Sequence, residues 1–364
     1  MQRRKTRSIK YGTVTLGGDA PVTVQSMTNT RTDDVHATVC QIMELYDAGC
    51  EIIRVAVPDM FAAKALPSII SQSPMPVIAD IHFDYRLALA SIEAGIHGLR
   101  LNPGNIKKPE HIKTVVIEAK SRNIPIRIGA NAGSLSKEWL ENTDHSLPHT
   151  ERIAQAMVSG AFSQINILQD LDFFDIVVSL KSSDVWTTIH AYRQMAKQCD
   201  YPFHLGITEA GPLVQGTVKS SIGLGMLLAD GIGDTVRVSL TDTPVKEVQV
   251  AHMILRSLGL RKVFPEIVSC PTCGRTRIPV IPIAREVEEK LSQIRADITV
   301  AVMGCEVNGP GEAREADIGI AGGDGFGILF KKGKIVERVP EAQLVDRLLF
   351  EIKQMIQLKG DNNP

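Results

Sequence analysis

The sequence predicts an α/β protein in which a TIM (β/α)8 barrel, residues 1–260, precedes a small α+β domain, residues 261–364. Eight short runs of apolar and β-branched residues alternate with helical patterns over about 250 residues, which is the size of such a barrel. The pattern changes after Leu260, and three of the six cysteines lie in the last hundred residues of the chain. With 364 residues, the chain is long enough for one large domain and a smaller one.

The expected barrel strands are short, and some are apolar almost throughout. Residues 52–57 read Ile-Ile-Arg-Val-Ala-Val, which is typical of a parallel strand covered on both faces. The eight expected strands are residues 22–25, 51–57, 76–81, 98–102, 124–129, 175–180, 202–207 and 234–240. An open doubly wound sheet is the alternative, but it normally has fewer strands and a glycine fingerprint after the first strand, which this sequence lacks.

Between these runs, apolar residues recur with the spacing of one helix face. Two such sets are Val35, Val39, Ile42, Met43 and Tyr46, and Val248, Ala251, Leu255 and Leu258. Beyond residue 260, strands are expected at residues 298–304, 317–321 and 326–330, and helices at residues 285–295 and 341–357. This mixture predicts the small α+β domain.

The composition indicates a cytoplasmic globular protein. Apolar residues make up 44% and charged residues 22%, and 40 Lys and Arg nearly balance 41 Asp and Glu. The formal net charge of −1 argues against a nucleic-acid binder or a polybasic membrane binder. No apolar run approaches the ~20 residues of a membrane helix, and the basic start is not followed by the hydrophobic stretch of a signal peptide.

Polar and charged residues gather where the expected strands end. In a TIM barrel the carboxyl ends of the strands meet at one mouth, where active sites form. These residues are Arg54, Asp80, His82, Arg100, Asn102, Arg127, Asn131, Lys181, His204, Glu209, Arg237 and Ser239. A single cation of this kind is more often a solvated loop charge. Several together predict a site for a polyanionic small molecule, such as a phosphate ester or a diphosphate.

Three of these side chains suit acid–base chemistry. His82 and His204 have three interpretations that the sequence leaves open: metal ligands, acid–base groups or buried core histidines. Glu209 lies among small residues in Gly-Ile-Thr-Glu-Ala-Gly, which makes it a candidate proton donor in a cleft. The alternative for Glu209 is a surface loop carboxylate.

Cys270, Cys273 and Cys305 indicate a metal centre in the second domain. Two cysteines separated by two residues can hold one metal centre, and the third lies in a second glycine-rich loop. A structural zinc site needs four ligands, and only three thiols are found together. They favour an iron–sulfur cluster in which one iron is bound by a weaker ligand than a thiolate. A zinc site is the remaining alternative. The carboxylates near the third cysteine are Glu306, Glu312 and Glu315. The other cysteines, Cys40, Cys50 and Cys199, are expected to be buried core thiols.

Six motifs, in order, resemble the family of bacterial 4-hydroxy-3-methylbut-2-enyl diphosphate synthases, which are iron–sulfur enzymes of the non-mevalonate isoprenoid pathway. The motifs are Val-Gln-Ser-Met-Thr-Asn-Thr (24–30), Arg-Leu-Asn-Pro-Gly-Asn (100–105), Arg-Ile-Gly-Ala-Asn-Ala-Gly-Ser-Leu (127–135), Leu-Gly-Ile-Thr-Glu-Ala-Gly (205–211), Cys-Pro-Thr-Cys (270–273) and Met-Gly-Cys-Glu-Val-Asn-Gly-Pro-Gly-Glu-Ala (303–313). The resemblance extends over nearly the whole chain.

The resemblance implies a TIM barrel joined to a [4Fe–4S] domain with the ligands Cys270, Cys273, Cys305 and Glu312. It implies that His204, Glu209 and Glu312 act in catalysis. The residues implied to bind substrate are Arg54, Arg100, Asn102, Arg127, Asn131, Lys181 and Ser239. His82 is also expected to bind substrate, because it follows the end of an expected strand. The implied reaction is the two-electron reductive ring opening of 2-C-methyl-D-erythritol 2,4-cyclodiphosphate, with flavodoxin or ferredoxin as electron donor.

The position of the expected tether predicts a head-to-tail homodimer. The eighth barrel helix, about residues 245–258, should end at the face opposite the mouth, and residues 260–269 are a short connection. The second domain would therefore reach the mouth of a neighbouring subunit more easily than its own. Two rival functions are a phosphate-binding barrel lyase or transferase with a structural zinc module, and a nucleic-acid-binding zinc ribbon, which the neutral charge balance disfavours.

Overall fold

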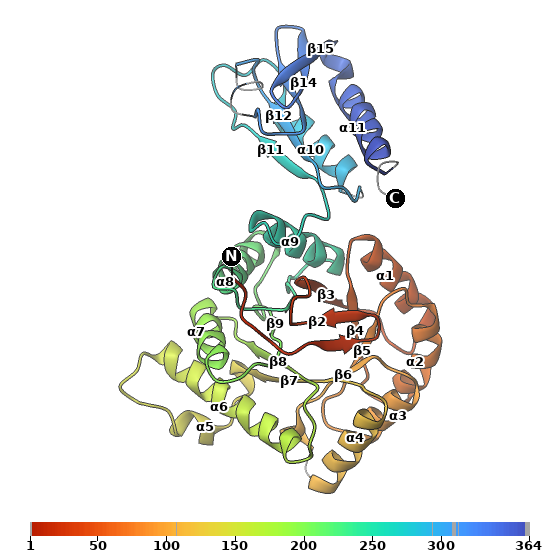
Figure 1. The fold of residues 1–364 in the computed structure, drawn as a ribbon, viewed down its shortest axis with the longest axis vertical. Coiled ribbons are helices and arrows are strands. Elements are labelled where there is room, and N and C mark those ends of the chain that lie inside the picture. Colours follow the sequence, from red (N-terminus) through yellow and green to blue (C-terminus); the bar gives the residue numbers. More distant parts are fainter. Residues whose placement is uncertain (1, 107, 293, 308–310, 312, 361–364) are drawn as a thin grey trace. The chain divides into compact units, whose positions relative to one another are not determined.

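The computed structural model describes residues 2–106, 108–292, 294–307, 311 and 313–360. The chain divides into two compact units, Met1–Arg261 and Lys262–Pro364. In the first unit, helices surround a ring of strands, whereas the second unit has one sheet with helices packed on it (Figure 1). None of the helices in the described part of the chain has the length and apolarity needed to cross a bilayer.

Eight parallel strands form the barrel, as the sequence predicts. They are β3 (Thr23–Met27), β4 (Ile52–Ala56), β5 (Val77–Asp80), β6 (Gly98–Arg100), β7 (Ile126–Asn131), β8 (Ile176–Lys181), β9 (His204–Leu205) and β10 (Thr235–Val236). The strand order is β8-β7-β6-β5-β4-β3-β10-β9, and an isolated parallel bridge between Val178 and Phe203 brings the two ends together. The TIM-barrel fold class is thereby confirmed.

The barrel helices follow the strands and lie outside the ring (Figure 1). They are α1 (Val35–Asp47), α2 (Met60–Gln72), α3 (Tyr85–Glu93), α4 (Pro109–Ser121), α5 (Lys137–Glu141), α6 (His149–Gln169), α7 (Val185–Ala196), α8 (Leu213–Ala229) and α9 (Pro244–Ser257). Aspartate side chains cap α1, α2, α3 and α7 by accepting a backbone amide of the first turn. The polar residues before these helices thus fix the loops at the carboxyl ends of the strands.

The buried face of α1 differs from the one predicted. Thr38, Ile42 and Leu45 are buried, whereas Met43 and Tyr46 are exposed. Cys40 lies two residues from both Thr38 and Ile42, on the opposite side of the helix, and is exposed. The prediction of a buried thiol is therefore wrong for Cys40, while Cys50 is buried and Cys199 is half-buried. The other predicted helix face is confirmed, because Val248, Ala251 and Leu255 of α9 are buried.

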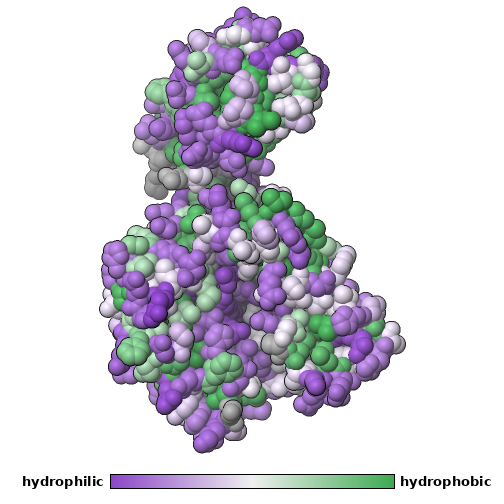
Figure 2. Space-filling model, turned by 180° about the vertical axis from the view of Figure 1, so that it is seen from behind, coloured by the Kyte–Doolittle hydropathy of each residue, from purple (hydrophilic) through white to green (hydrophobic). Residues whose placement is uncertain are grey.

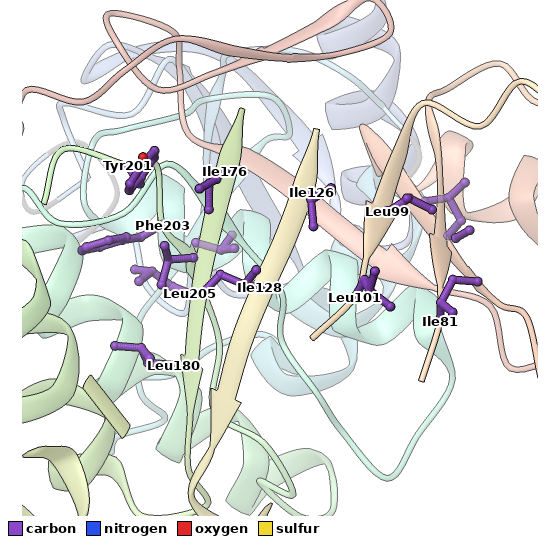
Figure 3. Close-up of a cluster of buried hydrophobic side chains, with 14 of the residues drawn as sticks. Ile81, Leu99, Leu101, Ile126, Ile128, Ile176, Leu180, Tyr201, Phe203 and Leu205 are labelled. Atoms are coloured by element: carbon purple, nitrogen blue, oxygen red, sulfur yellow. The ribbon is translucent and has the colours of Figure 1, made fainter. Parts of the chain in front are cut away.

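Strict alternation along each strand separates the apolar core from the barrel interior. Ile126 and Ile128 of β7, and Leu99 and Leu101 in and just after β6, belong to the cluster that packs against the helices (Figure 3). Because side chains alternate between the faces of a strand, Arg100 and Arg127 point the other way, into the barrel. The same two-residue period places Lys181 and His204 inside.

A β-hairpin that the sequence analysis did not predict closes the amino end of the barrel. Strands β1 (Ile9–Tyr11) and β2 (Val14–Leu16) pair antiparallel, and Ile9, Tyr11 and Leu16 pack in one cluster with Ile52, Ile78 and Val177 near the starts of three barrel strands. A Cβ at Gly98 would lie 2.3 Å from Cε1 of Tyr11, so this position must be glycine for the tyrosine ring to enter. The open mouth is therefore at the carboxyl ends of the strands.

The second unit is the α+β fold expected, with two further strands. Its sheet runs β11 (Glu266–Ser269), β12 (Thr299–Met303), β13 (Ile318–Gly322), β14 (Phe326–Lys331) and β15 (Lys334–Pro340). Helices α10 (Val280–Leu291) and α11 (Leu344–Gly360) contribute to one apolar cluster with the sheet. The sequence analysis missed β11 and β15, because both are mostly exposed edge strands without a strong apolar run, and it placed α10 five residues too late.

Candidate active site

A buried aspartate lies between two arginines at the carboxyl end of the barrel. The Asp80 carboxylate is 3.4 Å from Nε of Arg54 and 3.5 Å from Nη1 of Arg100. Arg54 and Arg100 lie on the strands that flank β5, and Arg100 is directly opposite Asp80 in the sheet register. Burial opposes ionisation of Asp80, but Arg54, Arg100, Arg127 and His82 outweigh it and hold its pKa below the usual value. Asp80 therefore fixes both arginines as a charged group.

Arg127 extends the basic set across β7 and is almost fully buried. Its Nη1 donates to Oε1 of Gln25 at 3.2 Å, and Gln25 itself points inward from β3. Burial lowers the pKa of Arg127 to about 10. The guanidinium thus stays protonated at neutral pH with a neutral amide, not a carboxylate, as its side-chain hydrogen-bond partner.

Arg237 completes the ring of guanidinium groups next to β10. Its Nη2 lies 3.4 Å from Oε2 of Glu247, a buried carboxylate in the first turn of α9 that also accepts the amide of Leu240 at 2.9 Å. The sulfur of Met27 lies 3.8 Å from Nη1 of Arg237 and 3.2 Å from Nε of Arg54. A thioether therefore lies between two of the arginines.

Lys181 and His204 form a buried pair inside the barrel. Nζ of Lys181 is 3.3 Å from Nε2 of His204. Burial, followed by Arg127, Arg54, Arg237 and Arg100, lowers the pKa of Lys181 well below its usual value. Burial and Lys181, with the arginines, lower the pKa of His204 in the same direction. His204 is thus a neutral imidazole at neutral pH, held beside Lys181 inside the barrel, and is not a histidine of the apolar core.

The charge balance of the mouth favours an anion. Among the described residues considered above, five basic side chains are accompanied by two carboxylates, those of Asp80 and Glu247. The basic residues are Arg54, Arg100, Arg127, Lys181 and Arg237. Viewed from the side opposite the hairpin, hydrophilic side chains surround the hollowed centre of the barrel (Figure 2). Burial and neighbouring guanidinium groups lower the pKa of Arg54 and of Arg127, so phosphate oxygens that enter between these like charges should bind favourably.

The structure brings most of the predicted substrate-binding residues to this mouth. Asn102 accepts the amide of Gly129 through Oδ1 at 3.0 Å, which ties the loop after β6 to β7. Asn131 ends β7, and Ser239 lies half-buried beyond β10. His82 is exposed in the loop after β5, so the interpretation as a buried core histidine is wrong for it.

Glu209 lies in the loop after β9 with an unusual backbone. Its φ is +51°, in the left-handed region that a residue with a Cβ adopts only at some cost. The carboxylate is exposed. Strain of this kind, at the mouth of a barrel, is typical of residues held for a function.

Sequence reasoning missed Gln25, Met27 and Glu247 as parts of the site. Gln25 and Met27 are two residues apart on the same short strand. Because side chains on one face of a strand recur every two residues, the sequence could have predicted that both face inward. Glu247 carries no such signal, because an acidic residue in the first turn of a helix is ordinary. Only the packing of α9 against β3 brings its carboxylate to Arg237.

The three cysteines of the second unit lie on loops at one edge of its sheet. Cys270 follows β11 directly and Cys305 lies two residues after β12, and these two strands pair in parallel. Sγ of Cys270 accepts a hydrogen bond from the amide of Gly304 at 3.1 Å. Hydrogen bonds from Arg275, first from its backbone and then from its side chain, lower the pKa of the exposed Cys273 thiol.

These donors fit a thiolate-held metal centre chemically. Soft sulfur ligands on two adjacent loops and an N–H···S hydrogen bond are features of such sites. Within the described part of the chain, no three His, Cys, Asp or Glu side chains already converge as a formed metal site. Glu312, the expected fourth ligand, lies outside the described residues.

Known proteins match both units. A family model described as the GcpE TIM-barrel domain matches residues 6–252, and one described as the GcpE protein C-terminal domain matches residues 266–354. The chain is 57% identical over 354 residues to the 4-hydroxy-3-methylbut-2-en-1-yl diphosphate synthase (flavodoxin) of Geobacter sulfurreducens, covering 97% of this chain and 99% of that protein. Proteins with the same name from Caldanaerobacter subterraneus subsp. tengcongensis and Lawsonia intracellularis are 56% and 54% identical, covering 97% of this chain and 98% and 97% of theirs.

The barrel with its basic mouth, together with these relatives, defines an oxidoreductase built on a TIM barrel. Two matched family models and relatives that are 54–57% identical over nearly the full length then decide the family. The chain belongs to the GcpE family. The family resemblance, the enzyme class and the role in isoprenoid biosynthesis inferred from the sequence are thereby confirmed.

Proposed function

We propose that this enzyme reduces 2-C-methyl-D-erythritol 2,4-cyclodiphosphate to (E)-4-hydroxy-3-methylbut-2-enyl diphosphate. The observation that carries this proposal is the set of five basic side chains around Asp80 at the carboxyl end of the barrel. Two linked phosphates carry several oxygens in a small volume, which matches guanidinium groups placed on neighbouring strands. The names of the relatives, which specify a diphosphate synthase, support the same substrate class.

Substrate binding falls to the residues of the mouth. Arg54 and Arg100, fixed by Asp80, and Arg127, fixed by Gln25, are proposed to grip the diphosphate. Lys181 adds a further cation from β8, and Asn102, Asn131 and Ser239 supply neutral hydrogen-bonding groups around the ring. His82, exposed in its loop, is proposed to border the entrance. These contacts orient the ring and compensate the negative charge that ring opening leaves on the diphosphate.

In the overall reaction, two electrons enter, the ring C–O bond to the diphosphate breaks, and a hydroxyl leaves as water. Glu209 is proposed to donate the proton that converts the departing hydroxyl into water, since it is the carboxylate on the loop after β9. His204, kept neutral by Lys181 and the arginines, is proposed to contact the reacting part of the substrate as a hydrogen-bonding group.

The electrons require a redox group, because no side chain of the mouth supplies them. Cys270, Cys273 and Cys305 are proposed to hold a [4Fe–4S] cluster, with Glu312 as the fourth ligand. The hydrogen bond from Gly304 to Cys270 and the lowered pKa of Cys273 support thiolate ligands there. When bound, such a cluster supplies single electrons at low potential and an iron open to exchange.

The two domains are proposed to have separate functions. Residues 1–260 bind the substrate, and residues 261–364 bind the cluster. Flavodoxin is the proposed electron donor because it appears in the names of the relatives, with ferredoxin as the alternative. The head-to-tail homodimer and the cytoplasmic location stay predictions. Mixing a variant defective in the mouth with one defective in the cysteines tests the dimer, because composite sites would restore activity.

The deciding experiment combines metal analysis with an assay on the cyclic diphosphate. Anaerobically purified protein should contain iron and inorganic sulfide, and 31P NMR should show the cyclic diphosphate becoming linear only when a reductant is present. Arg100→Met should lose this turnover, whereas Arg193→Met should keep it, because Arg193 pairs with Asp230 on the outer surface, away from the mouth. Zinc without sulfide, together with no reduction, would support the rival barrel with a structural zinc module.

A further inference from the structure

The barrel closes between β8 and β9 with fewer backbone hydrogen bonds than a parallel ladder would supply. Val178 and Phe203 form an isolated bridge, and the amide of Val178 donates to the carbonyl of Pro202 at 2.9 Å. In a parallel ladder of this register, the next bond would run from the amide of Leu180 to the carbonyl of His204. That bond is not made directly.

The hydroxyl of Tyr192 is inserted at that place. The amide of Leu180 donates to the Tyr192 oxygen at 2.9 Å, and the Tyr192 hydroxyl donates to the carbonyl of His204 at 2.5 Å. Tyr192 comes from α7 and is fully buried, with its ring tilted against Phe203 at a centroid distance of 5.4 Å. One phenol oxygen therefore satisfies both backbone groups.

The insertion sets the distance between the two strands at the level of the site. Two hydrogen bonds in series span more than the about 2.9 Å of one direct bond. Lys181 follows Leu180, and His204 supplies the carbonyl that Tyr192 binds. The two side chains whose nitrogens are 3.3 Å apart therefore lie directly beside this hydroxyl-bridged gap between β8 and β9. A Cβ at Gly206 would lie 2.9 Å from Nζ of Lys181, which shows that the lysine passes across β9 in the space this glycine leaves.

We propose that Tyr192 is a positioning residue, whose hydroxyl spaces β8 and β9 so that Lys181 and His204 face the bound anion as a pair. What the pair binds rests on the function proposed above, whereas the spacing itself does not. Without the hydroxyl, Leu180 and His204 can bond directly. The strands then close, and Lys181 is displaced from His204.

The test compares Tyr192→Phe with Tyr201→Phe in the full-length, cluster-loaded enzyme. Tyr201 is a matched control, because it is also buried and its hydroxyl accepts a single bond, from Nε2 of Gln169 at 2.9 Å. The His204 ring signals are followed by NMR with 15N-labelled histidine and assigned by their loss in His204→Gln. Binding of inorganic pyrophosphate is measured by calorimetry.

Tyr192→Phe should shift the His204 ring signals without any ligand present and weaken pyrophosphate binding at least fivefold, while Tyr201→Phe changes neither. A folded Tyr192→Phe protein with unchanged His204 signals and unchanged pyrophosphate affinity would overturn the proposal. If Tyr192→Phe does not fold, the exchange rate of the Tyr192 hydroxyl is measured instead, by NMR of the wild-type enzyme labelled with [ζ-13C]tyrosine. A slowly exchanging Tyr192 hydroxyl supports the bridge, and one that exchanges as fast as in solvent refutes it.

The two proposals fail separately. An enzyme that does not reduce the cyclic diphosphate, yet shows the ligand-free His204 shift in Tyr192→Phe, would refute the proposed substrate and support the spacing role of Tyr192.

Discussion

Nε of Arg54 lies 3.2 Å from the sulfur of Met27, so a neutral thioether accepts a hydrogen bond from a guanidinium at the floor of the mouth. A carboxylate at this place would hold the arginine more strongly but would also cancel its charge. Met27 also approaches Arg237, at 3.8 Å. The thioether therefore orients two cations and leaves their charge available to a ligand.

Replacing Met27 by glutamate should weaken binding of the cyclic diphosphate. The added carboxylate would pair with Arg54 and Arg237, and a loss of about tenfold in affinity, or about 1.4 kcal/mol, is expected. Met27→Leu, which removes only the weak sulfur acceptor, should have a smaller effect. Calorimetric titration measures both, with Met43→Glu on the exposed face of α1 as the control. Equal affinities for Met27→Glu and Met43→Glu would contradict this role.

Asp80→Asn should destabilise the ligand-free enzyme at neutral pH by about 3 kcal/mol, because breaking a buried ion pair leaves unpaired charges. The pKa of Asp80 is depressed in the folded state, so its contribution is present above the unfolded value and is lost as the pH falls through the folded value. The difference in unfolding free energy between wild type and Asp80→Asn should therefore shrink in acid, below the reference pKa of 3.8. Chemical denaturation at several pH values measures it.

Pyrophosphate provides the control for Asp80→Asn. An anion between Arg54 and Arg100 should stabilise the variant more than the wild type, because it replaces the lost negative charge. A variant that pyrophosphate stabilises no more than the wild type would show that Asp80 does not hold these two arginines.

Substrate affinity should fall as the pH rises through the depressed pKa of Lys181. The lysine is charged below this pKa and neutral above it, whereas each phosphorus of a cyclic diphosphate has already lost its single acidic proton at neutral pH. In Lys181→Arg the charge persists, so the fall in affinity should move to higher pH. Lys120→Arg, an exposed lysine paired with Asp172, is the control and should leave the profile unchanged. Superimposable profiles of wild type and Lys181→Arg would argue against a titrating Lys181.

Gly98→Ala should destabilise the barrel by about 2 kcal/mol. The new Cβ would lie 2.3 Å from the ring of Tyr11, and both residues lie where the amino-terminal hairpin enters the barrel. Gly225→Ala in α8 is the control: nothing lies within 4 Å of a Cβ there, so the change should be neutral or slightly stabilising. Thermal unfolding compares the two. A Tm for Gly98→Ala at or above that of the wild type would mean that the hairpin does not plug the barrel as described.

Much of the fold could be predicted because barrel strands carry a local signal. A short apolar run such as Ile-Ile-Arg-Val-Ala-Val encodes both its strand character and, through its period of two, the inward direction of Arg54. The hairpin at residues 9–16 carried no such signal, since three-residue strands are too short for periodicity to be recognised. The edge strands β11 and β15 were missed for another reason: most of their residues are exposed, so neither strand carries a strong apolar run.

The sequence by itself determined the TIM barrel, the cluster of cations at the strand ends, the family, and the positions of three cysteines on two loops. Only the tertiary structure decided which groups meet: Asp80 with Arg54 and Arg100, Met27 with Arg54, Glu247 with Arg237, and the Tyr192 hydroxyl between Leu180 and His204. The physical reason is the separation along the chain of the residues that interact. Strand and helix patterns arise from neighbours along the chain, whereas these contacts join side chains that come together only when the barrel closes.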